Sequence, residues 1–457
     1  TSTHQSSGTQ GDDAGIGTIA WTNPGNIVSN NNSYAMANLT VGTTSHYLQA
    51  TNYGFNIPSG STISGIETKI GRLGTDGLGS DVRDNIVSLI KGGVVTGENK
   101  AAVTTDWPSA ETAATYGGIT DLWGTTWTAE DINSSNFGLA LAVRSSVGTR
   151  EAHVDYMQIT VTYQLSSTTT TVDCGSGVPI IDYEDSITCV ATVTRSAGTN
   201  TPAGSVNWST DGSGGFTTSP CTLSGAGASA TCSVTYTPSS VGSGTHLIAA
   251  TYAGNSNFLT SSGNQAVTVN KSTPTLSITN SPVVYNGSPQ AATVTSSVAG
   301  TVSNVKYDTS ATQPTDAGTY AVTADFTPTD TANYDSLTDA SAGNFVISPK
   351  ALTGSITADN KVYDGSDSAT IATRSLTGVV APDDVSYSGG TATFNNKHVG
   401  TGKTVSATGL SLSGADLGNY TVNSSATTTA NITQRPISVT AATNTKTYDG
   451  TTNSTGT

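Results

Sequence analysis

The stretch Tyr320-Ala321-Val322-Thr323-Ala324-Asp325-Phe326 decides the fold class, because apolar residues stand at every second position. A period of two places one face of a strand in a core and the other face in water. The stretch Phe137–Val143 (FGLALAV) is of the same kind. A period of 3.6 residues is not sustained anywhere, and the capping box Thr128–Asp131 predicts only a single helical turn inside a loop. The sequence therefore predicts an all-β protein.

The composition excludes several classes of partner. Charged residues make up 11% of the chain, and 17 Lys and Arg against 32 Asp and Glu leave a net charge of -15. A protein without a strongly basic face is not expected to bind nucleic acid or to dock on anionic lipid. Hydrophobic residues make up 35%, and no stretch approaches the roughly 20 apolar residues that span a bilayer. We therefore expect neither nucleic-acid binding nor membrane insertion within this segment.

The aromatic content separates a first domain from the remainder. Four of the five Trp residues precede residue 164, and the chain after it is rich in Thr, Ser and Gly with short strands. Met157, Ile159, Val161 and Tyr163 share one face of a strand that would close the first core. We expect a boundary near residues 164–168, and before it a larger, jelly-roll-like β-sandwich at residues 1–165, called the head below.

Beyond the head the chain repeats itself. Tyr285-Asn286-Gly287, Tyr363-Asp364-Gly365 and Tyr448-Asp449-Gly450 recur at intervals of roughly 80 residues, the size of a small β-sandwich. A second element is an Asn-aromatic pair late in each repeat, at Asn257-Phe258, Asn333-Tyr334 and Asn419-Tyr420. The Tyr-Asx-Gly triplets are interpreted as turns, in which Gly takes a positive φ, the Asx side chain caps, and the Tyr ring covers the end of the sandwich.

This repetition predicts tandem Ig-like β-sandwiches at residues 168–270, 272–348 and 350–434, followed by the incomplete start of a further repeat at 436–457. The junctions are short, and Pro274, Pro349 and Pro436 stiffen them. Linkers this short do not behave as flexible coils. We therefore expect an elongated, semi-rigid array, and we expect residues 436–457 to need further chain to close a sandwich.

All four cysteines lie within residues 174–232, and three connectivities are open to them. The pairs Cys174–Cys189 and Cys221–Cys232 are favoured, since one pair flanks the loop between the first two strands and the other flanks a hairpin turn. Each loop would contribute on the order of 3 kcal/mol by the chain-entropy argument. No Cys-x-x-Cys or nearby His supports a zinc site, so no metal is expected there. Two disulfides imply an oxidising compartment.

Three segments carry recognisable family motifs. Residues 168–270, with Pro202–Val206 (PAGSV) and Cys232–Pro238 (CSVTYTP), resemble a bacterial Ig-like repeat. Residues 272–348, with Val283–Gly287 (VVYNG) and Asp316–Tyr320 (DAGTY), are similar to the MBG repeats of bacterial surface proteins. Residues 350–434, with Lys361–Gly365 (KVYDG), resemble YDG repeats, and the segment from residue 446 (KTYDGTT) would open another. Below they are called the Ig-like domain, the MBG-like repeat and the YDG-like repeat. The resemblance implies stalks of large secreted or adhesin-like proteins that carry no catalytic residues.

Candidate binding residues are few. Trp107, Trp123 and Trp127 lie in loop-like stretches of the head, where flat rings of this kind stack on sugars; the alternative is that these rings fill the core. Trp208 is expected in the core of the Ig-like domain, and His246 is expected to be half-buried on a strand. The acidic groups Asp12-Asp13, Asp182–Asp185 and Asp383-Asp384 raise a weak Ca²⁺ possibility, but they lack the alternating pattern of a calcium loop and are interpreted as solvated loops. No nucleophile elbow, phosphate loop or zinc-protease motif is present, so no catalytic residue is expected.

The sequence thus predicts a non-enzymatic protein of the cell surface or extracellular space, structural or adhesive, in which a rod-like stalk of repeats presents the head. Its partners would be glycans or other cell-surface components. Two alternatives remain open. The chain is a subunit of an extracellular filament, self-associating by β-strand addition, or it is the carbohydrate-binding part of a larger secreted polysaccharide-degrading enzyme.

Overall fold

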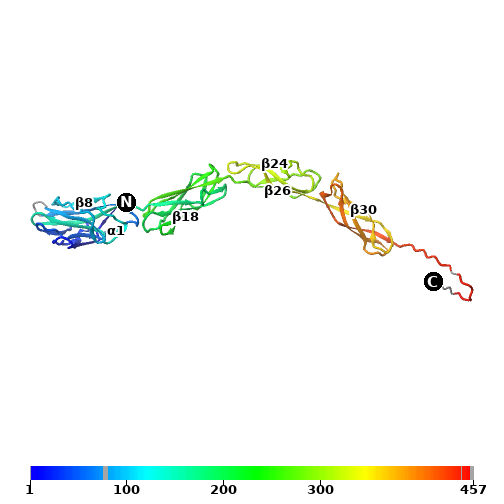
Figure 1. Ribbon diagram of the computed structural model, residues 1–457, viewed down its shortest axis with the longest axis horizontal. Helices are drawn as coiled ribbons and strands as arrows, with labels where there is room; N and C mark the ends of the chain where they lie inside the picture. The colour runs from blue at the N-terminus through cyan, green and yellow to red at the C-terminus, as the bar shows by residue number, and fades with distance from the viewer. Residues whose placement is uncertain (1, 76–80, 444, 453–457) are drawn as a thin grey trace. The chain divides into compact units, whose positions relative to one another are not determined.

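The computed structural model describes residues 2–75, 81–443 and 445–452, and their contacts group into two compact units, residues 1–271 and 272–457. Strands dominate both units (Figure 1), which confirms the all-β prediction. The α-helix of the first unit, α1 (Ala129–Asn133), is one short turn. It starts at the predicted capping box, in which the Thr128 hydroxyl accepts from the Asp131 amide at 3.1 Å and the Asp131 carboxylate accepts from the Thr128 amide at 2.9 Å.

The head is built from two sheets in jelly-roll order. The first sheet runs β1-β10-β5-β8, with β3 also paired to β10, and the second runs β2-β4-β9-β6-β7. The first sheet consists of β1 (Ser2–Ser6), β10 (Arg150–Gln164), β5 (Thr62–Thr75), β8 (Thr112–Gly118) and β3 (Ala35–Leu39). The second consists of β2 (Thr9–Asp13), β4 (Tyr47–Thr51), β9 (Gly138–Ser145), β6 (Val82–Lys91) and β7 (Val94–Thr96). A short 3-10 helix, η1 (Pro24–Ile27), contributes the buried Ile27.

The alternation read from the sequence explains the core of the head. Along β10 the side chains of Met157, Ile159, Val161 and Tyr163 are buried while their neighbours are more exposed. Strand β9, which lies between β4 and β6 in its sheet, is buried along most of its length. The predicted final core strand of the head is therefore present.

The Ig-like domain is a sandwich of two further five-stranded sheets, of order β11-β13-β18-β15 with β17 paired to β18, and β12-β20-β19-β14-β16. The first comprises β11 (Thr168–Asp173), β13 (Ile187–Arg195), β18 (Ser229–Pro238), β15 (Gly214–Phe216) and β17 (Ser224–Ala226). The second comprises β12 (Ile180–Asp182), β20 (Ser261–Asn270), β19 (Thr245–Tyr252), β14 (Ser205–Thr210) and β16 (Cys221–Thr222). Every regular ladder of these strands is formed within residues 168–270.

The MBG-like and YDG-like repeats of the second unit share the order of their main strands, and the YDG-like repeat adds β29 and β33. In the MBG-like repeat, β21 pairs with β23, and a second sheet runs β22-β26-β25-β24. The strands of this repeat are β21 (Leu276–Ile278), β23 (Val294–Ser296), β22 (Val283–Val284), β26 (Leu337–Ser348), β25 (Gly318–Pro328) and β24 (Gly300–Tyr307). In the YDG-like repeat, the corresponding sheets run β30-β27-β33 and β28-β34-β32-β31-β29. Its strands are β30 (Ile371–Thr377), β27 (Lys350–Ala358), β33 (Tyr420–Val422), β28 (Lys361–Val362), β34 (Ser425–Thr433), β32 (Gly400–Ser413), β31 (Ser386–Phe394) and β29 (Ser368–Ala369).

The described residues that follow β34, 434–443 and 445–452, form no strand. Their apolar side chains are accordingly exposed, with 81% of Ile437 and 87% of Val439 accessible. Across the described ranges, no helix has the length and apolar character of a membrane span.

Candidate functional site

The three candidate ligand-binding tryptophans of the head lie in its core. Trp107, Trp123 and Trp127 are 2%, 0% and 7% exposed. Each indole N–H donates within the head, to Asp84 Oδ1 at 2.8 Å, Ile66 O at 2.9 Å and Leu122 O at 3.0 Å. A stacking platform for a sugar needs an accessible ring face, and Trp107 and Trp123 offer none, so the core alternative describes them. Trp127 borders a hollow.

Trp107 belongs to a buried polar cluster that the sequence did not indicate. Asp84 is 0% exposed, and its carboxylate accepts from the Trp107 indole, from the Tyr116 hydroxyl at 2.7 Å and from the Ala102 amide at 2.9 Å. Arg72, 6% exposed, forms an ion pair with Asp84 and lies over the rings of Trp107 and Tyr116. Burial, and then the Asp84 charge, raise the pKa of Tyr116. Arg72 Nη1 is paired in this way, whereas Arg72 Nε is buried and has no hydrogen-bond partner among the described residues. The pair joins β5 of one sheet to β6 of the other and is closed to solvent, so it does not serve as a binding site.

The hollow beside Trp127 has a volume of about 590 Å³ and lies within the first unit. Ile63, Leu122 and Trp127 supply its apolar wall, and Glu130 and Thr199 are among its polar residues. The hydroxyl of Ser61 on this wall is buried and has no hydrogen-bond partner among the described residues. The Glu130 carboxylate accepts from the Ser59 hydroxyl at 2.9 Å. The hollow therefore combines an apolar wall from the head with polar residues from the head and from the Ig-like domain.

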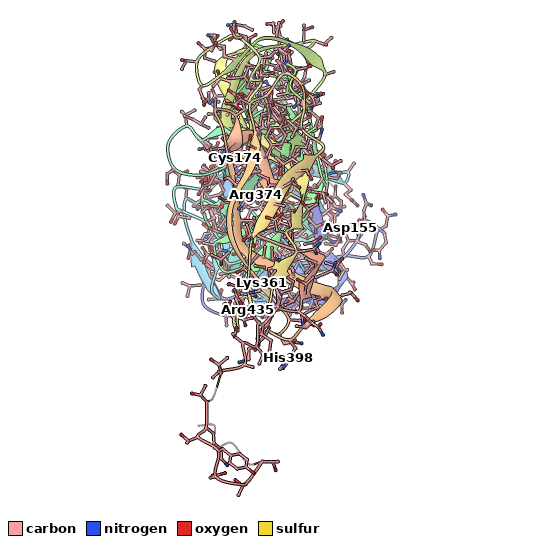
Figure 2. The ribbon with its side chains drawn as sticks, turned by 90° about the vertical axis from the view of Figure 1, so that its right-hand side faces the viewer. Asp155, Cys174, Lys361, Arg374, His398 and Arg435 are labelled. Carbon is pink, nitrogen blue, oxygen red and sulfur yellow. A yellow bond between two sulfur atoms is a disulfide. The ribbon has the colours of Figure 1, made fainter. Side chains whose placement is uncertain are left out.

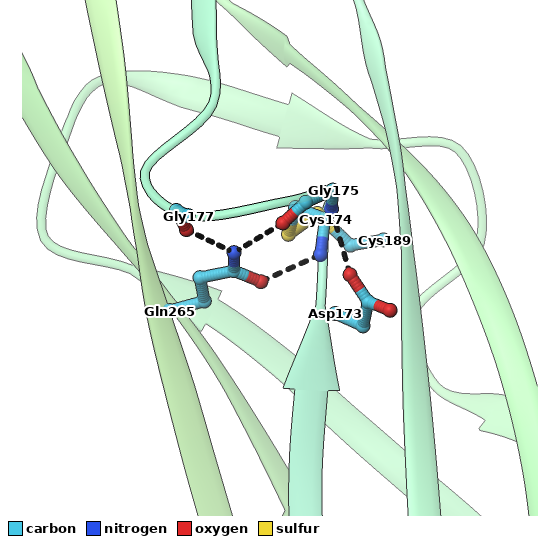
Figure 3. Close-up of a disulfide and its surroundings, with 6 residues drawn as sticks. All are labelled: Asp173, Cys174, Gly175, Gly177, Cys189 and Gln265. Atoms are coloured by element: carbon cyan, nitrogen blue, oxygen red, sulfur yellow. Dashed lines mark hydrogen bonds between the residues drawn. A yellow bond between two sulfur atoms is a disulfide. The ribbon is translucent and has the colours of Figure 1, made fainter.

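The cysteines of the Ig-like domain pair as Cys174–Cys189 and Cys221–Cys232, the connectivity that the sequence favoured. Figure 3 shows the surroundings of the first disulfide. The Gln265 carboxamide accepts from the Cys174 amide at 2.6 Å and donates to the carbonyls of Gly175 and Gly177 at 2.8 and 2.9 Å. Gln265 lies on β20, so its side chain ties the disulfide loop that follows β11 of one sheet to strand β20 of the other.

Trp208 and His246 of the Ig-like domain are both core residues. Trp208 is 6% exposed and its indole contacts Cys221 Sγ at 3.0 Å, as a core Trp beside a disulfide. His246 was predicted to be half-buried, which is wrong, because its side chain is fully buried. Its Nδ1 lies 2.7 Å from the Tyr236 hydroxyl and its Nε2 lies 3.2 Å from the Val241 carbonyl. Because both ring nitrogens are engaged within the core, a ligand role for His246 has no geometric support.

In two of the three acidic groups, Asp12-Asp13 and Asp383-Asp384, the carboxylates accept hydrogen bonds within the protein. Asp12 accepts from the Trp21 amide at 2.8 Å and pairs with His46 at 2.8 Å. Asp384 accepts from the Ala415 amide at 3.4 Å. Within residues 2–75, 81–443 and 445–452, no group of three or more His, Cys, Asp or Glu side chains is arranged to hold a metal ion. The weak Ca²⁺ possibility therefore gains no ligand set in the part of the chain that the structure describes.

The three Tyr-Asx-Gly triplets form the predicted turns, but the prediction that each Tyr ring covers the end of a sandwich is wrong for Tyr448, which is 94% exposed. In each, the Asx side-chain oxygen accepts at 2.9 Å from the amide two residues later, in the pairs Asn286–Ser288, Asp364–Ser366 and Asp449–Thr451. The glycines take positive φ values of 80°, 87° and 78°. In the second turn Lys361, labelled in Figure 2, binds Asp364 at 3.0 Å and lies over the Phe394 ring.

The first of these tyrosines also joins two repeats within the second unit. Tyr285 is 4% exposed, and its ring packs edge to face on Tyr420 of the YDG-like repeat, with ring centroids 5.4 Å apart. The hydroxyls of Tyr285 and Tyr420 donate to the same oxygen of Asp383, at 2.7 and 2.6 Å. The Tyr420 hydroxyl also accepts from the Val380 amide at 3.0 Å. Burial, and then the bond to Asp383, raise the pKa of both phenols.

A second set of contacts closes the same junction. Asn419 is 6% exposed; its carboxamide oxygen accepts from the Ala317 amide at 2.6 Å and its nitrogen donates to Asp316 at 3.2 Å. Leu352 and Tyr420 of the YDG-like repeat complete the apolar cluster that contains Tyr307 and Phe345 of the MBG-like repeat. The recurring Tyr and the recurring Asn-aromatic pair of neighbouring repeats thus meet at one interface, which the sequence did not indicate.

Comparisons with known proteins find two domain families in the second unit. Residues 274–351 match the MBG domain family, and residues 348–430 match the YDG domain family. A search of curated proteins gives no match. Among solved structures, the crystal structure of the N-terminal four Ig domains of Dscam1 isoform 8.4 is similar at 10% identity, covering 85% of this chain and 98% of that chain, with a TM-score of 0.16. A TM-score this low carries no argument about function or domain arrangement.

Proposed function

We propose that this chain is a non-enzymatic extracellular protein whose β-sandwich repeats act as a spacer and whose head is the part presented to partners. The observation that carries the proposal is the junction of the MBG-like and YDG-like repeats. A shared apolar cluster and the Tyr285–Asp383–Tyr420 hydrogen bonds tie two small domains into one body. A joint of this kind transmits orientation along the chain, which a flexible linker does not do.

Two further features support an extracellular setting. The disulfides Cys174–Cys189 and Cys221–Cys232 require an oxidising compartment to persist. The chain has only 17 Lys and Arg residues, and it therefore offers few cleavage sites to trypsin-like proteases. Its domain families match repeats rather than any catalytic domain.

Small-angle X-ray scattering of the whole chain tests the spacer role. The expected particle is elongated. When Tyr285→Ala and Asp383→Ala loosen the junction, the particles are expected to span a wider range of largest dimensions. Tyr363→Ala is the matched control, since the same residue type is removed from an equivalent turn outside this junction. A compact globular particle, or a flexible coil in the unaltered protein, would contradict the proposal.

The hollow beside Trp127 favours glycan binding by the head as a second candidate function. Cavities that take sugars combine an apolar surface with a few polar groups, and Ile63, Leu122, Glu130 and Thr199 supply both. A glycan-array screen of the full chain tests this role, with Thr126→Arg to fill the hollow and Thr104→Arg as an exposed control elsewhere on the head. Binding that survives Thr126→Arg would place the ligand elsewhere, and no binding to any glycan would remove this candidate.

A further inference from the structure

Tyr285 and Tyr363 occupy the same position in their repeats. In the MBG-like repeat Val284 pairs in parallel with Ser348, and the Tyr285 amide donates to the Ser348 carbonyl at 2.9 Å. In the YDG-like repeat Val362 pairs in parallel with Thr433, and the Tyr363 amide donates to the Thr433 carbonyl at 2.9 Å. Both tyrosines then enter the same Asx turn with a glycine at positive φ. The two turns therefore present their rings at equivalent ends of two sandwiches.

The surroundings of the two rings differ. Tyr285 is covered by Tyr420, and its hydroxyl is bound by Asp383 of the following repeat. Tyr363 packs one side of its ring on the core of its own repeat and remains half-buried. The Tyr363 hydroxyl has no hydrogen-bond partner among the described residues. Tyr363 thus presents a large ring with an unbound hydroxyl at the position where Tyr285 is docked on the next repeat. This difference indicates an interface that is not filled at Tyr363.

The acceptor for such a ring is specific to one type of repeat. In the YDG-like repeat, Val380 and Asp383 lie on the loop between β30 and β31, and Gly287 of the preceding turn approaches Val380 closely. In the MBG-like repeat, the corresponding loop between β23 and β24 is Ser297-Val298-Ala299, which carries no carboxylate. A hydrogen bond from a hydroxyl to a partly buried carboxylate is strong and directional. The loop with the Asp therefore selects which repeat can follow a Tyr-Asx-Gly turn.

We propose that Tyr363 and its turn, residues 361–366, form a docking surface for a further YDG-type repeat, which receives the ring on its own counterparts of Val380, Asp383 and Tyr420. The occupant is a repeat joined after β34, since the Asp383 acceptor of this chain is already filled by Tyr285. The existing interface supplies the chemistry: one phenol, one carboxylate acceptor and one edge-to-face aromatic contact. This proposal goes beyond the spacer role, because it assigns a head-to-tail recognition rule to particular residues.

Extending the full chain tests this rule. Residues after Thr433 are replaced by Pro and a copy of residues 350–434, which reproduces the Ser348-Pro349-Lys350 spacing of the existing junction. Nitration of each tyrosine is then followed by mass spectrometry. The expected result is that the nitration rate of Tyr363 falls about tenfold relative to the unextended chain, because a docked ring reacts only when the junction opens. Changing the counterpart of Asp383 to Ala in the copy is expected to restore most of the reactivity.

Three controls separate docking from misfolding. Tyr387, whose hydroxyl donates to the Asn423 carbonyl at 2.8 Å, reports whether each YDG-type repeat is folded. A copy of residues 272–349 in place of the YDG copy lacks the acceptor loop and is expected to leave Tyr363 reactive. In a second variant, residues 272–349 are replaced by a copy of the YDG-like repeat. The counterpart of Tyr363 in that copy then faces Val380, Asp383 and Tyr420 of the native YDG-like repeat.

Unchanged nitration of Tyr363 beside a protected Tyr387 in the copy would overturn the proposal. Equal protection of Tyr363 by the MBG copy would overturn its specificity. A copy that stays unfolded in both positions would also count against it, since the ring and its acceptor would then be insufficient to join two such repeats.

Discussion

The Ig-like domain and the MBG-like repeat are sandwiches of similar size that are stabilised in different ways. The Ig-like domain has a core of its own, in which Trp208, Tyr236, Tyr252 and Phe258 are buried beside the disulfides. The MBG-like repeat has no cysteine, and its core cluster contains fewer buried residues. Part of that cluster comes from the next repeat, through Leu352 and Tyr420. One domain is stabilised internally, and the other depends on its neighbour.

This difference shows how a small sandwich with few large apolar residues is made stable. A domain of this size buries a smaller fraction of its surface than a large one, so cross-links or a partner must supply the remainder. Disulfides act on the unfolded chain of one domain, whereas a shared junction couples two domains in one unfolding event. The second solution also fixes the orientation of the two repeats, which is what a spacer requires.

The largest expected effect is removal of both disulfides. Replacing Cys174, Cys189, Cys221 and Cys232 by Ala is expected to lower the free energy of unfolding of the Ig-like domain by about 3 kcal/mol for each cross-link. Hydrogen exchange measured by mass spectrometry resolves this domain from the others. The MBG-like and YDG-like repeats contain no cysteine and should exchange as before. Equal destabilisation of both units would break the comparison.

Tyr285→Ala is expected to have the next largest effect. It empties a buried aromatic site and leaves Asp383 with one donor fewer, so the MBG-like repeat should lose about 3 kcal/mol of unfolding free energy. Urea unfolding followed by hydrogen exchange of residues 272–434 measures the loss. Tyr363→Ala, at the equivalent turn, is expected to cost about 1 kcal/mol, because this ring is only half-buried. Similar losses for the two variants would mean that the junction adds no stability.

The phenols of the junction predict an alkaline weakness in the second unit. The pKa of Tyr285 and of Tyr420 is raised above the ordinary value of 10.0, chiefly by burial. A group whose folded pKa is raised gives stability that is complete below its unfolded pKa and lost as pH rises through the folded value. Thermal unfolding of the MBG-like and YDG-like repeats should therefore occur at lower temperature as pH rises above 10.0. The matched variant Tyr285→Phe should flatten this dependence; an unchanged slope in that variant would show that Tyr285 does not titrate in the junction.

The smallest expected effect distinguishes the Tyr-Asx-Gly turn of the YDG-like repeat, which contains Asp364, from that of the MBG-like repeat, which contains Asn286. The amide of Ser366, followed by Lys361, lowers the pKa of Asp364 to about 2 from 3.8. A depressed carboxyl pKa gives stability that is present above 3.8 and lost as pH falls towards 2. The MBG-like turn has Asn286 at this place and does not titrate, so of these two turns only that of residues 361–366 should show the acid-induced loss. Nuclear magnetic resonance of the Ser366 amide follows it, and Asp364→Asn should remove the pH dependence.

Local patterns account for what could be predicted from the sequence. Strand alternation identified the all-β fold and the last core strand of the head, and Tyr-Asx-Gly identified three turns, because an Asx turn is completed within two residues. The favoured cysteine pairs followed from short hairpins and loops, with sequence separations of 15 and 11. These features depend only on residues close together in the chain.

The features that the sequence did not reveal all depend on distant partners. Tyr285 and Asp383 are 98 residues apart, so nothing near the turn indicates that its ring is an interface. Trp107 and Trp123 lie in loops, and only the arrangement of both sheets shows that those loops fold into the core. His246 alternates like a half-exposed residue, yet Tyr236 from the facing sheet covers it.

The most direct test of the account measures the distance between the MBG-like and YDG-like repeats. Spin labels at Thr301→Cys and Ala372→Cys, exposed positions on β24 and β30, report it by pulsed electron paramagnetic resonance; the native cysteines that the structure describes are all paired. The account predicts one narrow distance distribution that broadens when Tyr285→Ala and Asp383→Ala are introduced. A broad distribution in the unaltered chain, or a narrow one that the double variant leaves unchanged, would contradict the claim that this junction joins the two repeats into one body.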